Sequence, residues 1–378
     1  MTGTSLDLAG RSVEVILANQ TPSGAFIASP TFSQYGYCWL RDGAFIAHAL
    51  DVVGEHAAAA RFHDWVSGVV LARRDCLERA GEAGRHGRPP RPEDYLHCRY
   101  SADGAESAVE WPSFQLDGPG IWLWSLGEHL AHGGELTPAR AEAAGLVADY
   151  LAALWLCPSY DAWEEHPEHV HTSTVGAIAT GVRAAGRYLA SSASSPRSVG
   201  RSGSADLAAS AELMVQNLRD TGAEGHLPKW RGNDAVDGSL LWLGYPFRAF
   251  RVDDPIFAAT LRRIEVELVS DEGAVYRYLQ DTYYGGGEWL LLTAALGSVY
   301  AERDAPGDRQ RALRCLEWIE RQADSDGQLP EQVAERALHA EWIEDWVSLW
   351  GPSARPLLWA HAAYLVLRRQ LEASTSGA

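Results

Sequence analysis

Two acidic stretches far apart in the chain contain residue types that could do acid–base chemistry. "YDAWEEHPEHVHTST" (160–174) places Glu164 and Glu165 directly after Trp163, and a distant "LPEQ" turn contains Glu331. A carboxyl that donates a proton needs surroundings that raise its pKa, and Trp163 with the like charge of Glu165 fits that need for Glu164. Glu331 fits a carboxylate that activates water. Two such carboxyls suit hydrolysis of a glycosidic bond, although the residues alone leave this pairing open.

The same stretch raises the alternative of a metal site. His166, His169 and His171, together with the nearby glutamates, are residue types that bind zinc. Pro167 interrupts the segment, so no helical H-x-x-x-H face can form, and His169 and His171 would alternate across an extended loop. We therefore predict no metal site and no cofactor, and we expect these histidines to be solvated or to support other side chains.

Five loops combine aromatic residues with carboxylates or amides, in a chain that has 15 Trp and 14 Tyr. The loops are "YGYCWLRDGA" (35–44), "EWPSFQLDGPG" (110–120), "YDAWEEH" (160–166), "YRYLQDTYYGGGEW" (276–289) and "QLPEQV" (328–333). A core would exclude the acids, and aromatic rings match the apolar C–H faces of sugars. We predict a polar, aromatic pocket where these loops converge.

Ordinary structural roles compete with this interpretation at several positions. Arg41 and Asp42 could form an ion pair at a helix start, and Trp163 and Trp289 could belong to the core. His48 and His361 lie on apolar helical faces, and we expect them to be core or supporting histidines.

The segments that must position these loops are predicted to be almost all helices. Apolar residues recur at intervals of three and four in about eleven or twelve segments, which come in pairs about every 60 residues. Starts such as "TPAR" and "DDPIF" combine a cap residue with proline. Because no sequence repeat accompanies the pairs, we predict a closed all-helical toroid. We expect residues 1–378 to form one domain, in which 79–94 and 191–204 are mobile loops.

Composition narrows the class of protein. With 50 acidic and 32 basic residues among 378, the net charge is −18, which disfavours nucleic acids and anionic membranes as partners. The N-terminal residues lack a secretory pattern, and no apolar run is long enough to span a bilayer. Five scattered cysteines without a CxxC pattern indicate reduced thiols, so we expect a cytoplasmic protein.

The five loops, in this order, resemble those of the glucoamylase family of inverting, exo-acting α-glucan hydrolases, glycoside hydrolase family 15. The resemblance runs from about residue 35 to 370 and is carried by "CWLRD", "YDAWEEH", "DTYYGG", "LPEQ" and "PLLWAHAAYL". It implies an (α/α)6 barrel, in agreement with the paired helices. Some relatives carry an N-terminal β-sandwich or a starch-binding module, and we expect neither here.

The resemblance also implies roles for individual residues. Glu164 would be the general acid and Glu331 the general base, about 6.5–9.5 Å apart as inversion requires. The remaining positions implied as substrate contacts are Trp39, Arg41 and Asp42 at the terminal glucose, Trp111, Gln115 and Asp117 on a mobile closing loop, Trp163 beside Glu164, and Glu165, Arg277 and Trp289 toward the leaving side. Glu288 departs from the proline of many relatives, which puts the linkage preference in doubt.

We therefore expect a hydrolase that releases β-glucose from short α-glucosides, with isomaltose and isomalto-oligosaccharides preferred. Short malto-oligosaccharides and trehalose are the alternatives within this class. A non-catalytic sugar-binding toroid is the rival from another class, and the presence of both Glu164 and Glu331 argues against it. A lyase would need a basic pocket, which the charge of −18 disfavours.

Overall fold

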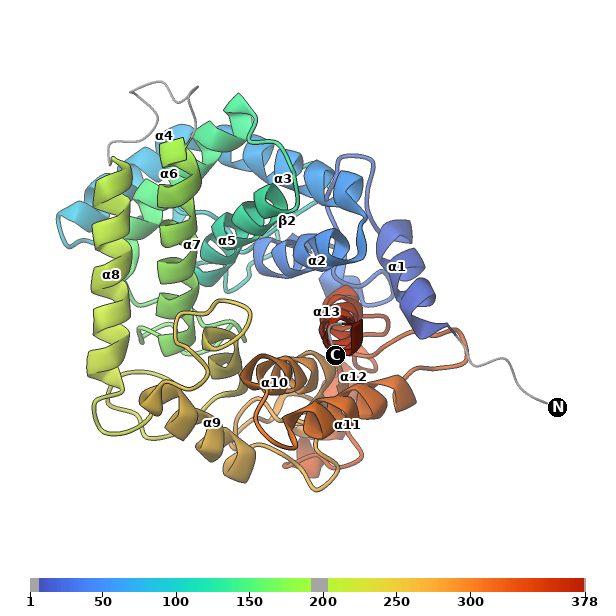
Figure 1. Ribbon diagram of the computed structural model, residues 1–378. Coiled ribbons are helices and arrows are strands. Elements are labelled where there is room, and N and C mark those ends of the chain that lie inside the picture. Colours follow the sequence, from blue (N-terminus) through green and yellow to red (C-terminus); the bar gives the residue numbers. More distant parts are fainter. Residues whose placement is uncertain (1–6, 192–202, 377–378) are drawn as a thin grey trace.

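Two concentric rings of helices surround a central axis in the computed structural model, which describes residues 7–191 and 203–376 (Figure 1). The inner ring contains α2 (Leu40–Val53), α5 (Asp117–Ala131), α7 (Thr172–Ser191), the 3-10 helix η3 (Gly238–Leu243), α10 (Leu290–Arg303) and α13 (Leu358–Ser376). The outer ring contains α1 (Leu8–Ala18), α3 (His56–Leu71), α6 (Pro138–Leu154), α8 (Ser204–Thr221), α9 (Pro255–Glu267) and α11 (Asp308–Arg321). The predicted (α/α)6 barrel is confirmed.

The two rings differ in how their helices are buried. Every residue of α2 from Leu40 to Asp51 is buried, whereas α11 buries one face and exposes the other. One large, continuous apolar core includes residues from every helix of the two rings. Within the described residues, no helix combines the length and apolar character needed to cross a bilayer.

The predicted helix starts are confirmed. The side chain of Thr137 accepts a hydrogen bond from the backbone N–H of Arg140, and Asp254 caps α9 in the same way. Proline follows each cap residue, at a position where a helix loses nothing by lacking a backbone N–H.

The expectation of a loop across 79–94 was wrong for its first half. Helix α4 (Arg74–Arg85) continues to Arg85 because Leu77, Ala80 and Gly81 are buried and the small Gly84 packs on α6. The other predicted loop, 191–204, lies mostly outside the described residues. All five cysteines are free.

Two short antiparallel ladders join the loops at one end of the barrel. β1 (Cys38–Trp39) pairs with β2 (Arg99–Tyr100), and β3 (Glu288–Trp289) pairs with β4 (Gln332–Val333). β1 leads directly into α2 and β3 into α10, so each ladder fixes an aromatic loop at the start of an inner helix. The second ladder also places Trp289 opposite Gln332, next to Glu331.

Helices α5 and α7 can pack closely because Gly120 and Gly181 lie where they meet. A methyl group on Gly181 would overlap the carbonyl oxygen of Gly120, whereas one on the exposed Gly68 of α3 would meet nothing within 4 Å. We expect Gly181→Ala to lower the free energy of unfolding by about 1–3 kcal/mol through overpacking. Gly68→Ala, the matched control, should raise it by about 0.5–1 kcal/mol through helix propensity. Thermal and denaturant unfolding would measure both, and equal effects would contradict this packing.

Candidate active site

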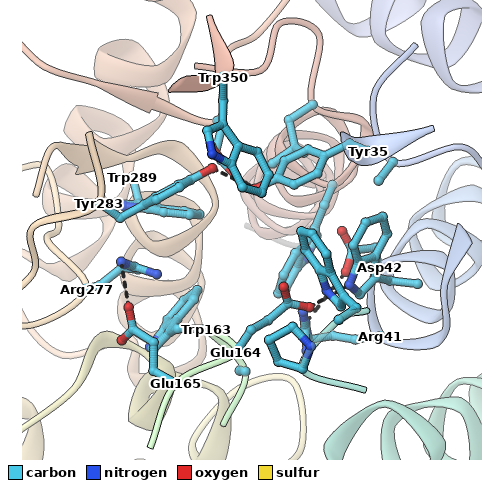
Figure 2. Close-up of a pocket in the computed structure, with 18 of the residues that line it drawn as sticks. Tyr35, Arg41, Asp42, Trp163, Glu164, Glu165, Arg277, Tyr283, Trp289 and Trp350 are labelled. Atoms are coloured by element: carbon cyan, nitrogen blue, oxygen red, sulfur yellow. Dashed lines mark hydrogen bonds and ion pairs between the residues drawn. The ribbon is translucent and has the colours of Figure 1, made fainter. Parts of the chain in front are cut away.

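The five polar, aromatic loops meet at a cavity of about 460 Å³ at the end of the barrel where the two ladders lie (Figure 2). Ten of the twelve predicted site residues line it: Trp39, Arg41, Asp42, Trp111, Trp163, Glu164, Glu165, Arg277, Trp289 and Glu331. Gln115 and Asp117 do not line the cavity. They are almost completely buried behind Arg41, at and just before the start of α5.

Glu164 occupies a tight turn with an unusual backbone conformation. Its φ is 71°, in the left-handed region that side chains other than glycine seldom adopt. Asp161 holds this turn, because its Oδ1 accepts the backbone N–H groups of Trp163 and Glu165, both at 2.9 Å. The carboxyl of Glu164 is oriented by neutral donors: Trp39 Nε1 at 2.7 Å and Gln115 Nε2 at 3.0 Å from Oε1.

Glu331 lies on another wall of the same cavity and is only 3% exposed. Its Oε1 accepts a hydrogen bond from the Tyr35 hydroxyl at 3.0 Å, and its Oε2 accepts one from Ser353 at 3.4 Å. Burial raises the pKa of Glu331 to about 7, and the hydrogen bonds and the charge of Arg277 offset only part of that rise. A carboxyl with this pKa is a stronger base than an ordinary glutamate.

Arg41 and Asp42 present polar atoms to the cavity. Arg41 donates to Gln115 Oε1 at 2.8 Å and to Asp117 Oδ2 at 3.1 Å, so its inner side is anchored. Its Nε and Asp42 Oδ2 make no hydrogen bond within the described part of the chain, but they lie 3.6 Å apart and form a buried ion pair. Burial raises the pKa of Asp42 to about 6 although Arg41 opposes the rise. The ion pair considered at this helix start is therefore present, and both of its residues also line the cavity.

Glu165 and Arg277 form the opposite polar wall. Arg277 Nη2 lies 3.4 Å from Glu165 Oε1 (Figure 2). Its Nε donates to Asp281 Oδ2 at 2.7 Å. The guanidinium also lies 5.1 Å from the ring centre of Trp289 and 5.3 Å from that of Trp163. This wall therefore combines a fixed cation with aromatic faces.

Glu288 does not take part in this wall directly. Adjacent residues of a strand point to opposite sides, so Trp289 faces the cavity while Glu288 is buried on the other face of β3. Glu288 therefore lies behind the wall that Trp289 helps to form.

Several cavity residues were missed from the sequence. Tyr35 and Tyr283 share a hydrogen bond of 2.8 Å between their hydroxyls, and Trp346, Trp350 and Trp359 complete the aromatic lining. Both tyrosines lie inside loops that the sequence analysis quoted, but neither was named there as a site residue. The tryptophans of α12 (Ile343–Trp350) gave no such signal, because helical spacing does not separate a cavity wall from a core.

The histidines show two kinds of environment. His166, His169 and His171 gather around Trp230, with the His169 ring stacked on it at 4.2 Å between ring centres. His361 is a satisfied core histidine, bonded to Ser12 Oγ and the Leu329 N–H. The ring nitrogens of His48 have no partner within the described residues.

Among the described residues, three buried side chains of types that can bind a metal ion lie close together. Asp51, His63 and His129 offer ligand atoms within 4.8 Å of one another. Asp51 lies near the end of α2, whereas Arg41 and Asp42 lie at its start, so this group is remote from the cavity. His129 and the half-exposed His56 already hydrogen-bond the Asp51 carboxylate.

Comparison with known proteins places this site in a family. The profile of glycosyl hydrolases family 15 matches residues 3–317. An isomaltose glucohydrolase from Kribbella flavida is 44% identical over 367 residues, which cover 97% of this chain and 92% of that protein. Trehalase 2 from Sulfolobus acidocaldarius is 24% identical over 330 residues, covering 77% of this chain and 53% of that protein.

Solved structures agree with the family match. A glycosidase in complex with glucose superposes with a TM-score of 0.89 at 42% identity, covering 97% of this chain and 96% of that chain. The glucoamylase from Saccharomycopsis fibuligera, at 16% identity, shares the fold with a TM-score of 0.72 and coverage of 99% and 97%. The chain therefore belongs to glycosyl hydrolases family 15 and is a glycoside hydrolase with an (α/α)6 barrel.

Proposed function

We propose that this protein is an inverting, exo-acting α-glucoside hydrolase that releases β-glucose from the non-reducing end of short α-1,6-linked glucosides. The observation that carries the proposal is the pair of carboxyls, Glu164 and Glu331, in one aromatic cavity, each oriented by neutral hydrogen-bond donors. The 44% identity to an isomaltose glucohydrolase supports the α-1,6 linkage.

In this mechanism Glu164 is the general acid and Glu331 the general base. Glu164 donates its proton to the glycosidic oxygen as the bond between that oxygen and C1 breaks. A water molecule attacks C1 from the opposite face, and Glu331 takes its proton. The configuration at C1 inverts, so an α-glucoside yields β-glucose and the rest of the substrate, whose former glycosidic oxygen is now a free hydroxyl.

The remaining predicted residues divide into contacts and supports. We assign Trp39, Arg41 and Asp42 to the terminal glucose, because all three line the cavity and Arg41 and Asp42 bring a charged pair to its wall. The residues assigned to the closing and leaving sides are Trp111, Trp163, Glu165, Arg277 and Trp289. Gln115 and Asp117 act behind the wall, where they hold Arg41, and Gln115 also holds Glu164.

The proposal extends to linkage, organisation and location. α-1,4-Linked oligosaccharides and trehalose are the alternative substrates, and the similarity to Trehalase 2 keeps trehalose in the comparison. We propose that residues 1–378 act as one catalytic unit around the large continuous core described above. The five free thiols support a cytoplasmic location. The net charge of −18 supports a small neutral sugar as the partner.

The first prediction of this proposal concerns the product. Incubation with isomaltose, maltose, panose and trehalose, followed by proton NMR within the first minutes, should show β-glucose first, with isomaltose consumed fastest. The anomer of glucose that forms first shows whether the configuration is inverted, because mutarotation later mixes α- and β-glucose. Initial α-glucose would rule out inversion, and binding of these sugars without any release of glucose would support the sugar-binding alternative.

The second prediction concerns pH. The base must be ionised to accept a proton, and burial raises the pKa of Glu331 to about 7, so kcat/KM for the free enzyme should fall as pH drops below about 7. The hydrogen bond from Tyr35 favours the ionised form. Tyr35→Phe should therefore raise the pKa of Glu331 and move this limb of the profile to higher pH.

Tyr37→Phe is the matched control for this prediction. Tyr37 lies two residues further along, and its hydroxyl hydrogen-bonds Ser107 at 3.3 Å. The pH profile of Tyr37→Phe should match that of the unmodified protein. An acidic limb that stays in place in Tyr35→Phe would contradict the assignment of Glu331 as the group seen in the profile.

A further inference from the structure

Lys229 is the only lysine in the chain, whose other 31 basic residues are arginines. It lies in the loop between α8 and η3, and its side chain is only 6% exposed. Lys229 does not line the cavity. A buried ammonium group is costly unless the surrounding structure pairs it, so its partners indicate what it does.

The ammonium group of Lys229 joins three segments of the barrel mouth. Its Nζ lies 3.1 Å from Asp237 Oδ2 and 3.4 Å from Asp161 Oδ2. It also lies 3.5 Å from the ring centre of Tyr278, a cation–π contact. A compact ammonium fits between two carboxylates and a ring face, a site that suits the wide, planar guanidinium of arginine poorly.

Both carboxylates hold the turn that contains the proposed general acid. Asp161 accepts the backbone N–H groups of Trp163 and Glu165, which flank Glu164. Asp237 accepts the indole N–H of Trp163 at 3.0 Å. Because Glu164 has a φ of 71°, the turn is unfavourable by itself and depends on these bonds.

Lys229 supplies the charge that both carboxylates need. Within residues 7–191 and 203–376, it is the only cation that forms an ion pair with either of them. Burial opposes ionisation of Asp237, but Lys229 and the hydrogen bonds from Ser239 and Trp163 hold its pKa below the usual value. Without Lys229, two buried negative charges would face each other beneath the turn.

We propose that Lys229 is a positioning residue for the general acid: it neutralises Asp161 and Asp237 and thereby fixes the turn that aims the Glu164 carboxyl at the glycosidic oxygen. The inference rests on the proposed role of Glu164. Lys229 touches neither Glu164 nor the cavity, so its effect passes through the backbone of 161–165 and the ring of Trp163.

The test compares two substrates that differ in their need for the acid. Isomaltose has a poor leaving group that must be protonated, whereas α-glucosyl fluoride loses fluoride without protonation of a sugar oxygen. With the fluoride, water attacks C1, the C1–F bond breaks and Glu331 takes the proton of the water. Loss of acid positioning should therefore affect isomaltose far more than the fluoride.

We expect Lys229→Met to lower kcat on isomaltose by about 100-fold, the cost of a misplacement of about 1 Å. Its kcat on α-glucosyl fluoride should stay within about fivefold of the unmodified protein, since this substrate has no leaving sugar to contact Trp163 or Glu165, and the residues assigned to the terminal glucose, as well as Glu331, are untouched. Equal losses on both substrates, or no loss on isomaltose, would overturn the proposal. Circular dichroism and thermal unfolding would establish that the variant is folded.

Two further variants separate this inference from the proposed function. Glu164→Gln should itself lose activity on isomaltose and keep activity on α-glucosyl fluoride. Equal losses on the two substrates in Glu164→Gln would refute the assignment of Glu164 as the general acid, and with it the inference about Lys229. Adding Asp237→Asn to Lys229→Met removes one unpaired charge while keeping an acceptor for Trp163. The double variant should regain at least tenfold in kcat on isomaltose over Lys229→Met, and no gain would overturn neutralisation as the mechanism.

Discussion

The balance of buried charge at the barrel mouth is the constraint on which the rest of the site depends. Three cations pair with carboxylates outside the proposed reaction: Arg41 with Asp117, Arg277 with Asp281, and Lys229 with Asp237. A buried cation must be paired in this way. Among the described residues, Glu164 and Glu331 have no ion pair of their own and are oriented by Trp39, Gln115, Tyr35 and Ser353. Neutral donors orient these two carboxyls without placing a cation in direct contact with either of them.

The closed ring of helices brings these charged residues together from distant parts of the chain. Inner helices α2 and α10 each begin directly after a short ladder, so the aromatic and charged loops are anchored at one end of the barrel. Asp117 lies in the first turn of α5, where the helix dipole favours a negative charge, and from there it anchors Arg41. The left-handed backbone at Glu164 is then held by side chains from separate loops. Rigid supports of this kind keep the carboxyls in place before a ligand enters.

Much of this arrangement was predictable from the sequence, because local patterns carry it. Helical periodicity indicated the paired helices, and the five loops indicated the cavity, including Glu164, Glu331 and Arg277. The sequence could not separate residues that form the wall from those one layer behind it, as Gln115 and Asp117 demonstrate. It also could not pair Tyr35 with Glu331, which are 296 positions apart, or Lys229 with Asp161. Such contacts arise only when the ring closes.

The central claim is that Glu331 activates the water that attacks C1 from the face opposite the leaving oxygen. The most direct measurement is chemical rescue of Glu331→Ala by azide, with the product identified by NMR. Azide needs no base and would occupy the position of the water, so the account predicts renewed cleavage of isomaltose with formation of β-glucosyl azide. Formation of α-glucosyl azide, or a β-azide product from Glu164→Ala but not from Glu331→Ala, would contradict it.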